Sequence, residues 1–184
     1  MNLLLDPVLI ERELYEKCDE ASKNFWCNSK PGVYGRGLCN TKFDPHKATR
    51  IGLLGECAVA KFLNLPLPDM NYVKGGKPID LQLGDLKIEV KTANYNYDRM
   101  LVYRENRKGR IIPLQSDVYV GCVIIREDKM WREACVGIVG WATRKEVAGG
   151  RLEWGLKKRH KNLVVDYSKL HDMKEIRDVS VSRK

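Results

Sequence analysis

The chain has 184 residues, a formal net charge of +9 and 43% hydrophobic residues. That composition is sufficient for a real core and excludes a disordered chain, and the length indicates one domain. No apolar run approaches the ~20 residues of a membrane span, and the first ten residues lack the basic start of a secretory signal. Six cysteines without a Cys-x-x-Cys pair predict reduced thiols in a cytoplasmic protein.

The positive charge is concentrated in two windows. Residues 99–112 carry a net charge of +4 and residues 144–161 a net charge of +5, which together account for the whole excess. Two basic clusters on a neutral body predict a polyanionic partner. Nucleic acid is the first candidate, and an anionic membrane surface is the second.

In chain order, the first predicted element is a helix. Asp6-Pro7 is typical of an N-cap followed by proline at the first helical position, and the helix is expected to run to about Asn24. Residues 28–43, rich in Gly, Asn, Ser and Lys, predict a loop. Asp44-Pro45 repeats the start signal for a second helix.

The second helix is expected to end near Leu65, before two prolines. Alternating patterns then predict a hairpin and three further strands, at 78–91, 100–103, 117–125 and 134–141. Short helices are expected at 143–147 and 168–177. This order predicts a sheet flanked by helices in one α/β or α+β domain.

The hairpin is the most informative stretch. Apolar and polar residues alternate on both sides of Gly84-Asp85, which suits a two-residue turn with glycine at the first central position. That turn sets a register in which Asp80 lies opposite Glu89, with both side chains on one face.

Two like charges about 5 Å apart repel by roughly 3 kcal/mol at an effective dielectric near 20. The fold must therefore protonate one acid, solvate the pair or place a cation between them. Lys91, two residues after Glu89, projects from the same face. A divalent cation with a lysine beside it fits this arrangement; the alternative is the solvated face of an ordinary hairpin.

Glu56 is the second unusual acid. It lies in the middle of the second predicted helix, and its neighbours at three and four residues are Gly52, Leu53, Val59 and Ala60. None of them can form an ion pair with it, and a buried acid without a partner is costly. We expect either a cation from elsewhere in the fold or a position at the edge of solvent.

Glu56 on a helix, Asp80 on one strand and Glu89-Val90-Lys91 on the next resemble the PD-(D/E)XK nuclease superfamily. That superfamily includes restriction endonucleases, archaeal Holliday-junction resolvases and phage exonucleases. The resemblance implies a restriction-endonuclease-like core, in which a central mixed sheet of four to five strands is flanked by helices.

The match covers residues 45–141, and Pro78 stands one place earlier than in the name-giving pattern. The implied organisation is a single nuclease domain over 1–184, with an N-terminal helix and loop appendage in 1–44 and a C-terminal extension in 142–184. The stretch Gln115–Tyr119 followed by Val136–Thr143, with Gly140-Trp141-Ala142-Thr143, is similar to small nucleases of phage genomes. Gln115 to Tyr119 has the QxxxY spacing of another branch, but it is expected on a strand and is set aside.

The resemblance implies hydrolysis of phosphodiester bonds with Mg²⁺ or Mn²⁺, held by oxygen ligands. Asp80 and Glu89 would bind the metal, and the Val90 carbonyl would add a third ligand. Lys91 would orient the attacking water or offset charge on the phosphate. Glu56 would bind a second metal or hold a metal-bound water.

The implied partner is DNA, with no role for a membrane, and two-site cutters of this superfamily are often homodimers. A phage-encoded protein acting in a bacterial cytoplasm fits the resemblance. The basic windows would contact the DNA backbone; the alternative for each is a solvated surface. The expected nucleic-acid contacts are Arg104, Arg107, Lys108, Arg110, Lys157, Lys158, Arg159 and Lys161.

Two other functional classes stay open. One is a nucleic-acid-binding module on a nuclease fold without turnover, against which the complete set of Asp80, Glu89 and Lys91 argues. The other is an RNA-processing nuclease, which typically relies on histidine chemistry, and the three histidines lie outside the motif. A zinc site is a further alternative, weakened by irregular spacing; its candidate ligands are Cys18, Cys27, Cys39 and His46. The sequence leaves endonuclease and exonuclease activity equally open.

Overall fold

The computed structural model describes residues 5–28, 45–70, 79–94, 98–106, 108–155 and 160–181. Short 3-10 turns lie at Tyr167–Lys169 and Met173–Glu175. The helices and strands of the described residues are β1 (Asp6–Ile10), α1 (Arg12–Asn28), α2 (Pro45–Leu63), β2 (Leu81–Leu83), β3 (Leu86–Asn94), β4 (Arg99–Glu105), β5 (Val118–Asp128), β6 (Glu133–Thr143), α3 (Arg144–Ala148), β7 (Arg151–Trp154), β8 (Lys161–Asp166) and α4 (Ile176–Val181).

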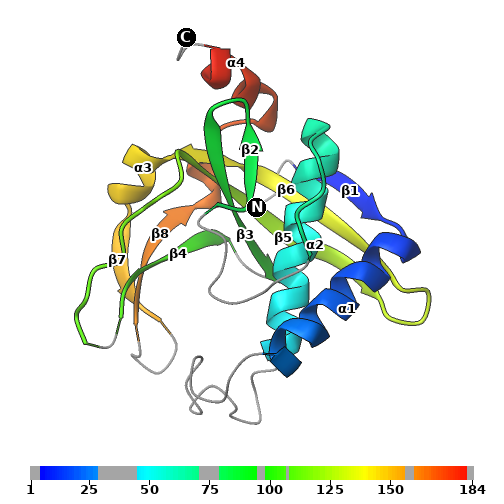
Figure 1. Ribbon diagram of the computed structural model, residues 1–184. Helices are drawn as coiled ribbons and strands as arrows, with labels where there is room; N and C mark the ends of the chain where they lie inside the picture. Colours follow the sequence, from blue (N-terminus) through cyan, green and yellow to red (C-terminus); the bar gives the residue numbers. More distant parts are fainter. Residues whose placement is uncertain are drawn as a thin grey trace.

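The main sheet has five strands in the order β1-β6-β5-β3-β2. It is mixed, because β3 and β5 run parallel while the other neighbours are antiparallel. Figure 1 shows α1 and α2 lying across one face of this sheet. The predicted mixed sheet of four to five strands, in a domain of mixed α/β class, is confirmed.

The helical face encloses the larger core. Because side chains alternate along a strand, Val120 and Cys122 of β5 and Val90 of β3 point toward the helices, where they join Leu54 and Cys57 of α2. The stretch Leu53–Ala60 is buried throughout, which accounts for its nearly all-apolar sequence. Flanking by helices is thus confirmed for this face.

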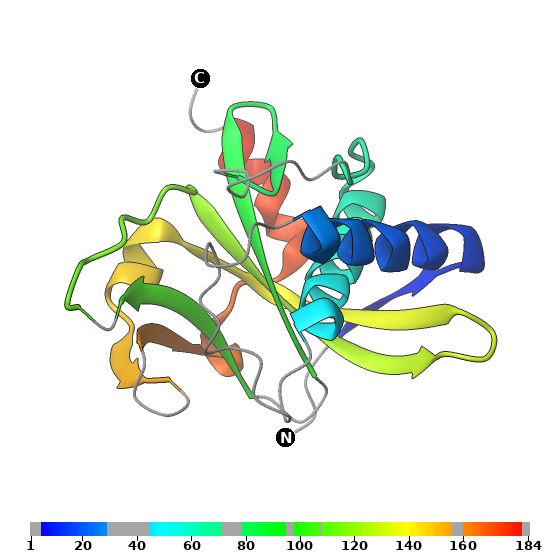
Figure 2. The ribbon, with the colours of Figure 1, turned by 60° about the horizontal axis from the view of Figure 1, so that its bottom comes forward.

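The opposite face is covered mainly by a second sheet, in the order β4-β8-β7, which Figure 2 shows to one side of the main sheet. Tyr119 and Val123 of β5 pack there against Met100, Leu163 and Val165. This differs from the prediction, because the strands β7 and β8 were not recognised. β8 has three consecutive apolar residues instead of an alternating pattern, and β7 has only four residues.

The expected first helix was wrong at its start. Asp6–Ile10 forms β1, which pairs antiparallel with β6, from Asp6 opposite Ile138 to Ile10 opposite Ala134. β1 is an edge strand, where a proline is tolerated because one side of the strand needs no hydrogen bond. Pairing with β6 therefore overrides the local start signal, and the helix begins at Arg12.

The remaining expectations have mixed outcomes. The second helix, the hairpin, the three later strands and the short helix after Thr143 are confirmed. Most of the loop 28–43, with Asp44, lies outside the described residues. The expected appendage 1–44 contributes β1 to the main sheet, and the expected extension 142–184 contributes the second sheet's β7 and β8. None of the described helices is long and apolar enough to cross a membrane.

Candidate active site

The hairpin of β2 and β3 has the register that its turn predicts. Leu81 pairs with Ile88, and Leu83 pairs with Leu86. Gly84, the first turn residue, has a φ of +58°, a conformation that glycine adopts without strain. The predicted register is therefore confirmed over the paired residues of β2.

Asp80 lies in a bend just before β2, where the regular pairing has ended. Its backbone N–H donates to the Ile88 carbonyl at 3.1 Å. Its carboxylate Oδ2 accepts a hydrogen bond from the Val90 N–H at 2.7 Å. The Asp80 carboxylate thus bonds to the edge of β3 instead of extending the ladder opposite Glu89.

The Val90 carbonyl is directed at the same edge. In a β-strand the N–H and C=O of one residue point to the same side, and this direction alternates along the chain. Because the Val90 N–H reaches Asp80, the Val90 carbonyl faces that side too. A carboxylate and a backbone carbonyl are therefore neighbours at this edge.

Glu89 and Lys91 project from the face of β3 that is turned toward the second sheet. Their register partners on β5 are Tyr119 and Gly121, and Tyr119 belongs to the core between the sheets. Lys91 Nζ lies 2.5 Å from Glu89 Oε1, and the two side chains are 32% and 25% exposed. The lysine is thus adjacent to the acid, and both remain accessible from solvent.

A segment just before β5 contacts the Glu89 carboxylate. Ser116 is fully buried, and its Oγ donates to Glu89 Oε2 at 3.4 Å. Arg144, the first residue of α3, donates to the Ser116 carbonyl at 2.7 Å and to Asp117 Oδ1 at 2.9 Å. Asp117 accepts a bond from the Lys87 N–H at 3.0 Å. These bonds tie the segment to β3.

The sequence did not predict a role at this site for Ser116, Asp117 or Arg144. Arg144 was counted only as part of the second basic window. A signal for its position was present, because Thr143 and Glu146 form a capping box, which places Arg144 at the first position of a helix. Its contacts with residues 27–29 positions earlier in the chain have no local signature.

Tyr119 lies next to Glu89 on the neighbouring strand and is fully buried. Burial first, and then the charge of Glu89, raise the pKa of Tyr119 to about 12, so the hydroxyl stays neutral at physiological pH. The QxxxY spacing that was set aside thus ends at a tyrosine beside the candidate site, on a strand as expected.

Glu56 is buried on α2, with 9% of its surface exposed. The preceding residue, Gly55, faces Thr92 of β3 so closely that an added Cβ would lie 1.8 Å from Thr92 Oγ1. Within the described part of the chain, no three His, Cys, Asp or Glu side chains are placed to hold a metal ion. Glu56 therefore does not join Asp80 and Glu89 in a group of three carboxylates.

The described residues of the first basic window belong to β4 and to the loop that follows it. The Asn106 side chain accepts bonds from the backbone N–H groups of Lys108 and Arg110, whose side chains are exposed. Arg104 donates to the Ile112 carbonyl and is close enough to Tyr119 for its charge to offset part of the rise in the Tyr119 pKa. Expected residues outside the described ranges are Pro78, Arg107, Lys157, Lys158 and Arg159.

Lys161 has partners within the second sheet. Its Nζ lies 2.9 Å from Glu105 Oε1 and 4.9 Å from the ring centre of Trp154. Both partners neutralise or shield the ammonium group, so Lys161 is less available for a phosphate than an exposed lysine.

Two of the alternative zinc ligands, Cys18 and His46, have other partners in the structure. Cys18 Sγ lies 3.7 Å from Cys57 Sγ, between α1 and α2. His46 Nε2 lies 2.8 Å from Ser22 Oγ. The side chains of Cys27 and Cys39 lie outside the described residues.

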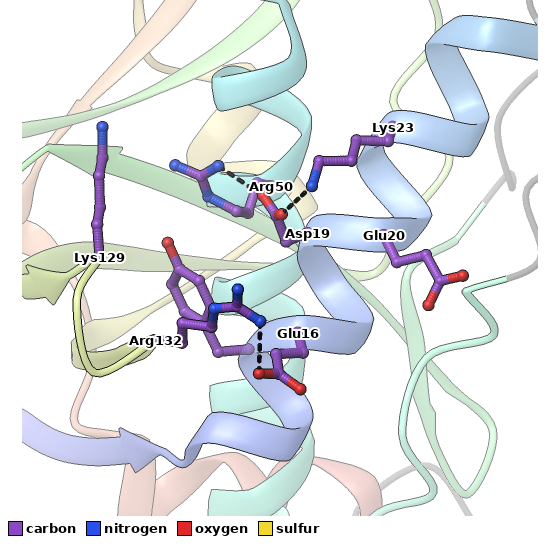
Figure 3. Close-up of a pocket in the computed structure, with 8 residues that line it drawn as sticks. Glu16, Asp19, Glu20, Lys23, Arg50, Lys129 and Arg132 are labelled. Carbon is purple, nitrogen blue, oxygen red and sulfur yellow. Dashed lines mark hydrogen bonds and ion pairs between the residues drawn. The ribbon is translucent and has the colours of Figure 1, made fainter.

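A pocket of about 490 Å³ between α1, α2 and the β5–β6 hairpin has a different character (Figure 3). Arg50, whose side chain is 9% exposed, lies 2.7 Å from Asp19 Oδ1 and 2.8 Å from Glu127 Oε1. Tyr15 also donates to Glu127 at 2.9 Å. The polar groups in this network bond to one another across three elements, which indicates a structural role.

Comparisons of the chain with family models, with curated proteins and with solved structures find no match.

Proposed function

We propose that the protein is a metal-dependent nuclease of the PD-(D/E)XK type that hydrolyses phosphodiester bonds of DNA. One observation carries the proposal: a single hairpin brings the acid before β2 to the backbone of the Glu89-Val90-Lys91 motif on β3. The Asp80 carboxylate bonds to the Val90 N–H, and Glu89 and Lys91, the residues on either side of Val90, form an ion pair on one face of β3.

The residues present fit a hard divalent cation. Asp80, Glu89 and the Val90 carbonyl offer only oxygen atoms, the donors that Mg²⁺ and Mn²⁺ prefer. Lys91 balances the charge of Glu89 in the structure, and a divalent cation would add to that balance when both carboxylates act as ligands. A bound metal would polarise the phosphate and lower the pKa of an attacking water.

Lys91 has the second role in the proposed reaction, which is to stabilise negative charge. Its ammonium lies against Glu89, so the carboxylate fixes where the positive charge stands. A cation held there offsets negative charge that develops on the phosphate during attack. Ser116 keeps the other Glu89 oxygen in place, and Arg144 holds Ser116 in turn. Both are positioning residues.

Positive charge around the site supports an anionic polymer as substrate. Arg104 of β4 lies near Tyr119, and Lys108 and Arg110 are exposed on the loop that follows β4. Phosphate contacts of this kind provide affinity without reading sequence.

The test is incubation with supercoiled plasmid, linear duplex, single-stranded DNA and RNA, each with Mg²⁺, with Mn²⁺ and with EDTA. The proposal expects metal-dependent cleavage of at least one DNA substrate. Tight binding without cleavage would instead identify a non-catalytic nucleic-acid-binding module. Cleavage of RNA alone would identify an RNA-processing nuclease.

A further inference from the structure

A second pocket begins at Lys91 and continues along β3 beyond the hairpin. It has a volume of about 280 Å³. The first turns of α2 form one wall, with Ala48 and Ile51, and β4 forms the other, with Arg99 and Leu101. The pocket therefore adjoins the group that the proposed function places at the scissile phosphate.

The walls of this pocket are mostly apolar. Ile51, Met100 and Tyr167 are buried residues that line it, while Lys91, Asn94 and Arg99 supply polar groups. Apolar walls would cost a phosphate its hydration without replacing it. They suit the flat faces of an aromatic heterocycle, whose polar atoms lie only at its edge.

The strand edge adds hydrogen-bonding groups. β2 pairs with β3 only as far as Ile88, and no described strand pairs with β3 on that side afterwards. Because strand directions alternate, the N–H and C=O groups of Thr92 and Asn94 point to the same side as those of Val90. A row of such backbone donors and acceptors along the strand edge can form hydrogen bonds with the edge of a nucleobase.

We propose that this pocket binds one unpaired nucleobase, next to the phosphodiester that Lys91 serves. The inference rests on the proposed function and names its substrate class: DNA with an unpaired nucleotide at the cleavage point, such as a single strand, a flap or a frayed end. A base within a duplex must first leave its stack, at a cost of a few kcal/mol. Pockets for drug-sized ligands have volumes of about 300–1,000 Å³, so the smaller volume here suits a single base.

The test measures binding in Ca²⁺ by fluorescence anisotropy, with a single strand, a matched duplex and a single strand that carries one abasic residue. Ala48 is exposed on α2, so Ala48→Trp fills the pocket without disturbing the core. Ala148→Trp is the matched control, at an exposed position on α3 away from the pocket. Melting curves confirm that both variants fold.

The wild type is expected to bind the single strand more tightly than the duplex at equal length. Ala48→Trp should weaken single-strand binding by about tenfold, in the range of one base contact, with little effect on the duplex. The affinity of the wild type for the abasic strand should be about as low as the affinity of Ala48→Trp for the normal strand. The control variant Ala148→Trp should bind both the normal strand and the duplex with wild-type affinity.

Equal weakening of single strand and duplex by Ala48→Trp, or unchanged binding of the abasic strand, would overturn the proposal. Because these measurements need no cleavage, they separate its failure from failure of the proposed function. If the protein cleaves DNA but its affinity does not depend on the base, the proposed nuclease function stands and the proposed base-binding pocket is rejected.

Discussion

At the scale of single residues, the central feature is the bond between the Asp80 carboxylate and the Val90 N–H. Its length of 2.7 Å fits a charge-assisted hydrogen bond. The same carboxylate is proposed to bind a metal, so its structural and chemical roles can be separated by substitution.

We predict that Asp80→Asn keeps most of the stability of the wild type without metal, because the amide oxygen can still accept from Val90. Asp80→Ala removes the acceptor and should cost roughly 0.5–1.5 kcal/mol of unfolding free energy. Urea unfolding in EDTA measures both. Equal destabilisation of the two variants would show that the bond to Val90 contributes nothing.

The sequence predicted the residues of this site better than their contacts. The Gly84 turn and the two-residue period were sufficient to align β2 with β3, since both are local signals. The position of Asp80 was not predictable, because its side chain competes with the backbone for the Val90 N–H where the ladder ends. Ser116 reaches Glu89, and Arg144 reaches Ser116, only through long-range packing.

At the scale of elements, the contact between α2 and β3 depends on Gly55. A Cβ there would lie 1.8 Å from Thr92 Oγ1, whereas a Cβ at Gly52 would meet nothing within 4 Å. The absence of a side chain at Gly55 therefore lets α2 approach β3 closely, whereas Gly52 has no such packing role.

We predict that Gly55→Ala lowers the unfolding free energy by about 1–3 kcal/mol, the usual cost of overpacking. The matched control, Gly52→Ala, should raise it by roughly 0.5–1 kcal/mol, because alanine favours a helix interior. Thermal or urea unfolding compares them. Adding Thr92→Ala to Gly55→Ala should restore much of the loss, and its failure to do so would place the strain elsewhere.

The network of α1, α2 and β5 supports a prediction about pH. Burial alone would raise the pKa of Asp19, but its bonds with Lys23 and Arg50 outweigh burial and hold that pKa below its ordinary value. A lowered folded-state pKa stabilises the protein above the unfolded-state pKa of ~3.9. This contribution is lost as the pH falls through the folded-state value.

Asp19→Asn should therefore cost roughly 1–3 kcal/mol at pH 7, and its difference from the wild type should shrink as the pH falls below about 4. Glu13→Gln is the control, since Glu13 is 84% exposed in a surface pair with Lys17 and should change stability little. Urea unfolding at several pH values measures the differences. A constant difference across this range would contradict the role of Asp19.

Local signals predicted most elements, and long-range pairing explains the exceptions. Asp6-Pro7 is a sound start signal for a helix, but five residues gain more from pairing with β6. β8 forms a strand by pairing with both β4 and β7. Such long-range pairing cannot be recognised in a short window of sequence.

At the scale of the whole molecule, the charge distribution predicts how binding depends on salt. Each phosphate contact contributes about −0.9 to the log–log slope for duplex DNA. Replacing Lys108 and Arg110 by alanine should thus make the slope shallower by up to about 2. Arg126 and Lys129 are exposed on the β5–β6 hairpin, and their double alanine variant controls for net charge. Equal slopes for both double variants would mean that the β4–β5 loop faces away from DNA.

The central claim is that Asp80, Glu89 and Lys91 support metal-dependent cleavage of DNA. The most direct measurement is the initial cleavage rate of the preferred DNA substrate in Mn²⁺ or Mg²⁺, for the wild type, Asp80→Asn, Lys91→Ala and Asp85→Asn. Asp85 is an exposed acid in the turn of the same hairpin, so its variant controls for lost charge. The account predicts cleavage by the wild type and Asp85→Asn that EDTA abolishes, and a loss of at least about 100-fold in the other two variants. Undiminished cleavage by Asp80→Asn, or full cleavage in EDTA, would contradict it.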